Sequence, residues 1–209
     1  TGMIGDFNPG AADGVASGYG YGPRVVAGAL YLSIDDGATG FDPWISDGTA
    51  AGSSRIADLA AGVGDGRLPS YESATSGVAD GGRELVSLAN WAVFSGFAPA
   101  TGWELWRTDG TPAGTTLLSD IQPGAVSSSP QRLTRVGNRV FFFADDGTHG
   151  QELWVSDGTP LGTLLVADLA AGDLLLNFQA QLPSPHYRGP DAAALNDRFL
   201  FIAEASTGM

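Results

Sequence analysis

Two Asp-Asp-Gly triplets carry the side chains in this sequence that are best suited to metal chemistry. Asp35-Asp36-Gly37 and Asp145-Asp146-Gly147 each place two adjacent carboxylates between apolar runs. Ca²⁺ takes about six to eight oxygen ligands, which carboxylates and nearby backbone carbonyls can supply. Two residues seldom suffice, and a third copy of the segment has Ser95-Gly96-Phe97 at this place. We therefore consider two roles for these four aspartates, namely calcium ligands or acidic turn residues.

The histidines offer the only acid–base chemistry that the sequence suggests. His149 lies in a predicted tight turn, and His186 lies in a long connector close to Tyr187, Arg188 and Asp191. This cluster could titrate or bind a ligand, or it could simply be a solvated loop. The sequence shows no nucleophile elbow, phosphate loop or zinc-ligand spacing. We expect no catalytic residues, no enzyme activity, and no cofactor apart from calcium at the aspartate pairs.

Three Asp-Gly-Thr triplets, beginning at Asp47, Asp109 and Asp157, predict hairpin turns. Glycine accepts positive φ, and the aspartate side chain accepts hydrogen bonds from nearby amides. The triplets resemble the Asp-boxes of sialidase propellers, but the Ser-x-Asp-x-Gly-x-x-Trp order is not met. We expect these aspartates to be structural.

These triplets belong to an internal repeat. Trp44, Trp106 and Trp154 each stand three residues before the aspartate of a triplet. An acidic residue precedes each tryptophan by two positions, which puts both side chains on one face of a strand. These acids are Asp42, Glu104 and Glu152. We expect the tryptophans to pack between repeats and the acids to accept hydrogen bonds from backbone or arginine.

Each repeat contains four short runs typical of strands, and no segment has a sustained helical period. In the shortest copy these runs are Gln131–Val136, Arg139–Ala144, Glu152–Ser156 and Thr163–Asp168. Four antiparallel strands in roughly 45 residues, repeated in tandem, indicate a β-propeller blade. A β-solenoid is the alternative, but its coils are usually shorter. The predicted fold class is all-β, a β-propeller of four-stranded antiparallel blades.

The repeats divide the chain into one propeller segment of about four incomplete blades. Their approximate bounds are 1–10 (partial), 11–62, 63–124, 125–172 and 173–209 (partial). This gives fifteen strands, one short of four blades, and the missing strand is one that carries the tryptophan. We expect either a piece of a longer array or a partner that supplies the missing strand.

The segment GxELWxxDGTxxGTxLxxDIxPG resembles the repeat of the bacterial ELWxxDGT family. Glu104-Leu105-Trp106 and Glu152-Leu153-Trp154 match it fully, whereas the first copy has Asp42-Pro43-Trp44. Pro43 removes a ladder donor, which suggests an edge or bulged strand. The resemblance covers nearly the whole chain. It implies a propeller-like repeat in large secreted or surface proteins, with no established catalytic residues.

Charge limits the range of partners. The formal net charge is −13, and the ten basic residues are all arginine. Such a surface repels phosphate backbones and anionic lipids, so we expect no nucleic-acid partner and no membrane insertion. The sequence contains no cysteine, which excludes a disulfide scaffold and thiolate metal sites.

Variable loops on a rigid scaffold are the usual place for function. The connectors 11–22, 63–82 and 173–190 should emerge on the same face as the Asp-Asp-Gly turns. We therefore expect a bacterial extracellular or cell-surface module with a structural or protein-interaction role, in adhesion or a surface assembly. Its partner would be another protein, or a neighbouring copy at the open blade ends. The alternative is a glycan-binding or glycan-processing propeller that uses the connector face, with Tyr187, Arg188 and Trp91.

Overall fold

The computed structural model describes residues 6–8, 24–61, 85–168, 193–195 and 198–200. These residues form an all-β structure with three four-stranded antiparallel sheets and one two-stranded hairpin. Sheet 1 contains β1 (Arg24–Val26), β2 (Ala29–Asp35), β3 (Phe41–Ser46) and β4 (Ser54–Arg55). Sheet 2 contains β5 (Leu85–Leu88), β6 (Trp91–Ala98), β7 (Gly102–Thr108) and β8 (Thr116–Ser119). Sheet 3 contains β9 (Gln131–Val136), β10 (Arg139–Asp145), β11 (Gln151–Ser156) and β12 (Leu164–Ala167).

Within each sheet the strands follow one another in chain order as an up-and-down meander. The Asp-Gly-Thr triplets therefore connect the third strand to the fourth, and the Asp-Asp-Gly triplets connect the second to the third. Because strand direction alternates, these two kinds of turn lie at opposite ends of a sheet. The sequence predicts this arrangement, with one error: Ser95-Gly96-Phe97, expected in place of the Asp-Asp-Gly turn of sheet 2, lies within β6 and pairs with β7.

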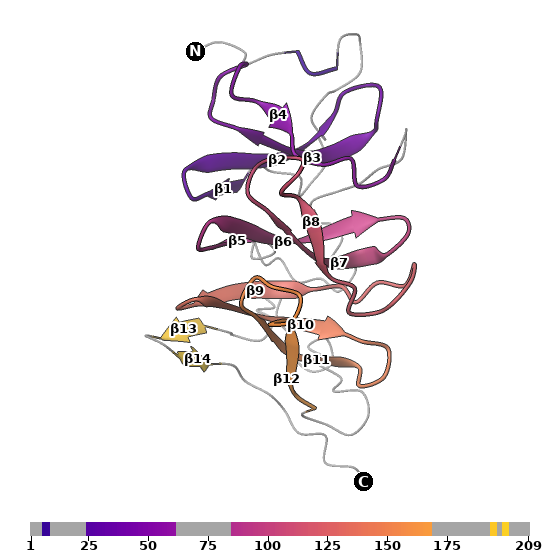
Figure 1. Ribbon diagram of the computed structural model, residues 1–209, viewed down its shortest axis with the longest axis vertical. Coiled ribbons are helices and arrows are strands. Elements are labelled where there is room, and N and C mark those ends of the chain that lie inside the picture. Colours follow the sequence, from indigo (N-terminus) through magenta and orange to yellow (C-terminus); the bar gives the residue numbers. More distant parts are fainter. Residues whose placement is uncertain (1–5, 9–23, 62–84, 169–192, 196–197, 201–209) are drawn as a thin grey trace, which may run out of the picture.

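The three sheets lie one above another along the long axis of the molecule (Figure 1). Two apolar clusters join them. The first contains Ile56 and Tyr31 of sheet 1 with Phe94 of sheet 2. The second contains Leu118 of sheet 2 with Phe142 of sheet 3. A single sheet of four strands cannot bury both of its faces, so stacking provides the core.

Two of the three repeated tryptophans lie at these interfaces. Trp106 is partly buried against the cluster between sheets 1 and 2, and Trp154 against the cluster between sheets 2 and 3. Trp44 has an edge-to-face contact with Phe7, with ring centroids 5.3 Å apart. Phe7 occupies the place in its repeat that Ile121 occupies in another.

A two-stranded hairpin lies beside sheet 3, formed by β13 (Ala193–Leu195) and β14 (Arg198–Leu200). The pairs β1–β5, β5–β9 and β9–β13 are in contact, so successive sheets approach each other at their first strands. β13 therefore holds the first-strand position of a fourth sheet (Figure 1).

The predicted strands and the observed strands agree closely in the third repeat. Gln131–Val136 is a strand with the predicted bounds, and the other three differ by one or two residues. Fourteen strands lie in the described ranges. Residues 6–8, at the end of the predicted first partial repeat, are not in a strand, while residues 1–5 fall outside those ranges. In the ranges that the structure describes, no helix is long and apolar enough to cross a membrane.

Candidate functional site

The Asp-Gly-Thr turn is held together by its own aspartate. In sheet 2, Oδ1 of Asp109 accepts hydrogen bonds from the amide and the hydroxyl of Thr111, at 2.9 and 2.7 Å. The Thr111 hydroxyl oxygen in turn accepts the amide of Gly114 at 3.0 Å. The hydrogen bonds from the side chain and amide of Thr111 lower the pKa of Asp109. The same bonds recur around Asp47 and Asp157.

The glycine that ends this motif leaves room for the carboxylate. A Cβ atom built on Gly52, Gly114 or Gly162 would overlap the carboxyl group of the aspartate five residues earlier. The eight-residue motif Ser/Thr-Asp-Gly-Thr-x-x-Gly-Ser/Thr is thus a compact turn whose polar groups bond to one another. The motif is repeated because each copy forms the same turn and needs the same residues at these positions.

Replacing Gly114 by alanine should lower the free energy of unfolding by about 1–3 kcal/mol, the usual range for overpacking. The added Cβ must displace the Asp109 carboxylate from Thr111. In an Asp109→Ala background the same change should cost much less, because the overlapping group is gone. Urea denaturation of the four proteins in this double-mutant cycle measures the difference. Strictly additive losses would show that Gly114 does not act through Asp109.

A buried glutamate organises the connection between sheets 2 and 3. Glu104 on β7 is fully buried. Its Oε2 accepts hydrogen bonds from the Ile121 amide at 2.9 Å and the Ser128 hydroxyl at 2.6 Å. Its Oε1 accepts the amides of Ser128 at 2.9 Å and Gln122 at 3.4 Å. Burial raises the pKa of Glu104, although these bonds favour its charged form.

The Glu104 contacts also reach sheet 3. The carbonyl of Ser128, whose amide and hydroxyl bind Glu104, accepts the amide of Asp145 at 2.9 Å. One buried carboxylate thereby fixes a connector that touches both sheets. The prediction that the repeated acid accepts backbone hydrogen bonds is confirmed here.

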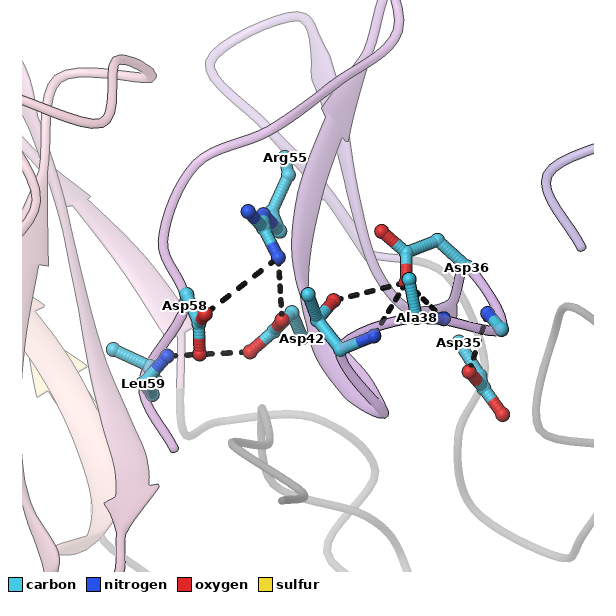
Figure 2. Close-up of polar contacts among 9 residues, drawn as sticks. Asp35, Asp36, Ala38, Asp42, Arg55, Asp58 and Leu59 are labelled. Atoms are coloured by element: carbon cyan, nitrogen blue, oxygen red, sulfur yellow. Dashed lines mark hydrogen bonds and ion pairs between the residues drawn. The ribbon is translucent and has the colours of Figure 1, made fainter. Parts of the chain in front are cut away.

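Asp42 has the corresponding position in sheet 1 (Figure 2). Its Oδ1 accepts the amide of Leu59 at 3.2 Å, and its Oδ2 lies 3.3 Å from Nη1 of Arg55. The same guanidinium nitrogen is 3.8 Å from Oδ2 of Asp58. Burial raises the pKa of Asp42 to about 6, although the hydrogen bonds and Arg55 act in the opposite direction.

This raised pKa predicts how stability depends on pH. A carboxyl group with a pKa of about 6 in the folded chain and an ordinary value of 3.8 binds its proton more tightly when folded. The stability that it contributes is present below about pH 4 and is lost as the pH rises through 6. We expect the free energy of unfolding to fall by about 2–3 kcal/mol across this window through Asp42.

Asp42→Asn should remove this fall in the free energy of unfolding with rising pH, since asparagine does not titrate. Guanidinium denaturation of both proteins between pH 4 and 7.5 measures it. Asp109→Asn is a matched control, because the pKa of Asp109 is lowered and its effect lies at lower pH. Parallel pH profiles for wild type and Asp42→Asn would contradict the prediction.

The Asp-Asp-Gly turns bind their own amides. Oδ1 of Asp35 accepts the Gly37 amide at 2.8 Å, and Oδ1 of Asp36 accepts the amides of Ala38 and Thr39 at 3.0 and 2.8 Å (Figure 2). Burial alone would raise the pKa of Asp36, but these hydrogen bonds hold it below its ordinary value.

The second turn of this kind adds a histidine. Oδ1 of Asp146 accepts the amides of Thr148 and His149, both at 2.9 Å. Nδ1 of His149 lies 2.7 Å from Oδ2 of Asp146, and this hydrogen bond raises the pKa of the histidine. Oδ1 of Asp145 accepts the Gly147 amide at 2.7 Å.

Calcium binding at these turns stays a prediction. Among the described residues no group of three or more acidic or histidine side chains could hold a metal ion. If calcium does bind at Asp35-Asp36 and Asp145-Asp146, it should raise the melting temperature, and Asp36→Asn should reduce that rise. Calorimetric titration with CaCl₂ is the direct measurement. No heat of binding and no shift in melting temperature would dispose of the hypothesis.

Arg107 and Trp91 form a contact that the sequence pattern did not reveal. The Arg107 guanidinium carbon lies 4.2 Å from the centroid of the Trp91 ring. Its Nη1 donates a 2.6 Å hydrogen bond to the Gly158 carbonyl in the Asp-Gly-Thr turn of sheet 3. Trp91 therefore takes part in an arginine contact that ties sheet 2 to sheet 3.

His186, Tyr187, Arg188 and Asp191 lie outside the described residues. The structure places the Asp-Gly-Thr aspartates and the Asp-Asp-Gly aspartates in separate turns. The hydrogen-bond partners of Glu104 lie 17 to 24 positions away in the sequence. The only sequence feature that indicates this network is the acid repeated two positions before each tryptophan.

Comparison with known proteins gives no match. No family model matches the chain, and neither a curated protein nor a solved structure matches it.

Proposed function

We propose that this chain is a non-enzymatic segment of a β-propeller of the ELWxxDGT repeat type, located outside the bacterial cell or on its surface. Its role is that of a structural or protein-interaction module, in adhesion or a surface assembly. The observation that carries the proposal is that polar side chains in and around the repeat motif make structural contacts. Asp109 holds its turn, Glu104 holds its connector, and Arg107 ties two sheets.

The contacts between sheets support the propeller. Successive sheets meet at β1, β5, β9 and β13. Sheets that converge at their first strands are arranged like blades around an axis, where the first strand is innermost. The net charge of −13 and the absence of lysine are compatible with a salty exterior.

Two experiments test the role. A panel of glycoside hydrolase substrates and a glycan array should show no turnover and no saturable glycan binding by the purified chain. Antibody labelling of intact cells should detect the protein at the surface, and external protease should remove it. Clear turnover would overturn the non-enzymatic role. Saturable glycan binding would favour the alternative, a glycan-binding or glycan-processing propeller.

A further inference from the structure

Sheet 1 departs from the other sheets at its buried acid. Strand β3 carries Asp42-Pro43, where sheets 2 and 3 carry Glu104-Leu105 and Glu152-Leu153. This is the only Asp-Pro pair in the sequence. All three acids are buried, and Asp42 is 0% exposed. The structural role of the repeated acid explains the burial, but it explains neither the shorter side chain nor the proline beside it.

The peptide bond between Asp42 and Pro43 has an unusual chemistry. Its nitrogen belongs to a tertiary amide without an N–H, and breaking the bond after protonation releases a basic secondary amine. The aspartate carboxyl group is tethered to the same bond, and its attack on the Asp42 main-chain carbonyl carbon closes a five-membered ring. Well-oriented tethered groups react as if present at about 10⁵–10⁸ M. The glutamates would need a six-membered ring and would release a leucine amine.

The fold supplies the acid form of this carboxyl group (Figure 2). Its Oδ1 accepts the Leu59 amide at 3.2 Å, and its Oδ2 lies 3.3 Å from Nη1 of Arg55. Among the described residues, the charged side chains that act on it are Arg55 and Asp58. Burial raises the pKa of Asp42 to about 6, Asp58 acts in the same direction, and Arg55 opposes them. Asp42 therefore keeps its proton at a pH where an ordinary aspartate is ionised.

We infer that the Asp42–Pro43 bond cleaves itself in the folded chain under mildly acidic conditions. The carboxyl proton passes to the Pro43 nitrogen as the carboxyl oxygen attacks the Asp42 main-chain carbonyl carbon. The C–N bond breaks, which leaves a cyclic anhydride on Asp42 and a secondary amine on Pro43. One water molecule then opens the anhydride to two carboxyl groups. Each molecule reacts once, so the inference goes beyond the proposed structural role and requires no turnover of another substrate.

The cut lies inside a strand whose pairing spans it. On the C-terminal side of the cut, residues 44–46 of β3 pair with residues 30–32 of β2. Tyr31 of β2 also belongs to the cluster that joins sheets 1 and 2. These contacts do not depend on the Asp42–Pro43 bond. Cleavage must therefore be measured under denaturing conditions, where the two fragments separate.

Denaturing mass spectrometry of the intact chain after incubation at pH 5 and pH 7.5 is the test. Fragments 1–42 and 43–209 should form at pH 5, and their masses should sum to the intact mass plus one water. They should not accumulate at pH 7.5. With a pKa of about 6 instead of 3.8, the acid form of Asp42 is about tenfold more populated at pH 5. The folded chain should therefore cleave about tenfold faster at this pH than the chain unfolded in urea.

Two variants test the chemistry. Pro43→Leu, which restores the residue of the other repeats, should abolish the fragments, and so should Asp42→Glu. Circular dichroism checks that each variant is folded, and protease inhibitors should leave the wild-type rate unchanged. The bonds Glu104–Leu105 and Glu152–Leu153 are internal controls that should stay intact. The inference would be overturned by the absence of fragments at pH 5, by equal rates in folded and unfolded chains, or by cleavage that survives Pro43→Leu.

Discussion

Replacing Glu104 by alanine is expected to lower the free energy of unfolding by about 3–5 kcal/mol, the range for removing one partner from a buried charged network. The alanine leaves the amides of Ile121 and Ser128, and the Ser128 hydroxyl, without the acceptor they have now. A buried donor without an acceptor costs about 1–3 kcal/mol. Equilibrium denaturation in guanidinium measures the loss.

Glu104→Gln is the control for side-chain size. Glutamine keeps one acceptor oxygen but turns its amide group toward a hydrogen-bond donor. The free energy of unfolding of Glu104→Gln should therefore lie between those of wild type and Glu104→Ala. A loss below about 1 kcal/mol for Glu104→Ala would show that the 120–129 connector is held by other contacts.

Replacing Phe142 by alanine should cost about 3–5 kcal/mol, as is usual for a buried phenylalanine. The ring is 0% exposed in the cluster that joins sheets 2 and 3, and Trp154 packs against that cluster. The cavity should therefore also change the tryptophan emission of the folded protein. Differential scanning calorimetry and fluorescence follow the two effects.

Leu161→Ala is the matched control for Phe142→Ala. Leu161 is 92% exposed in the Asp-Gly-Thr turn of sheet 3. Its removal should change stability by no more than about 0.5 kcal/mol. If the two alanine variants were equally stable, the cluster between sheets 2 and 3 could not be a source of cohesion.

The strands of each sheet could be predicted from the sequence because short segments of the chain determine where they begin and end. Asp-Gly pairs, short apolar runs and the tryptophan period determine where strands begin and end, as β9 and β10 show. Those signals depend on neighbouring residues and on backbone preferences, which are readable in one dimension. The meander within each sheet follows from its short turns.

The contacts between sheets could not be predicted in the same way. Arg107 reaches Gly158 across 51 positions, and only the stacking of sheets brings them together. The side chain of Gln122 lies so close to Gly147 that a Cβ atom there would overlap it. The side chain of Asn8 lies equally close to Gly37. Both contacts join the end of one repeat to the second turn of the next sheet, so neither is visible within one repeat.

These contacts show that the motif residues have structural roles. The most conspicuous motif, from the repeated acid through Asp-Gly-Thr, is used for turns, connectors and cohesion between sheets. The interaction role that we propose must then depend on residues outside this motif.

We expect that contacts between the sheets, rather than the sheets individually, hold this structure together. Denaturation followed by tryptophan fluorescence and by far-ultraviolet circular dichroism in the same samples tests it directly. Two of the five tryptophans, Trp106 and Trp154, lie at the interfaces and make the fluorescence sensitive to them, while the dichroism reports the strands. We predict coincident transitions that Phe142→Ala shifts equally for both probes. Strands that persist after the tryptophan emission has reached its unfolded value would contradict the claim.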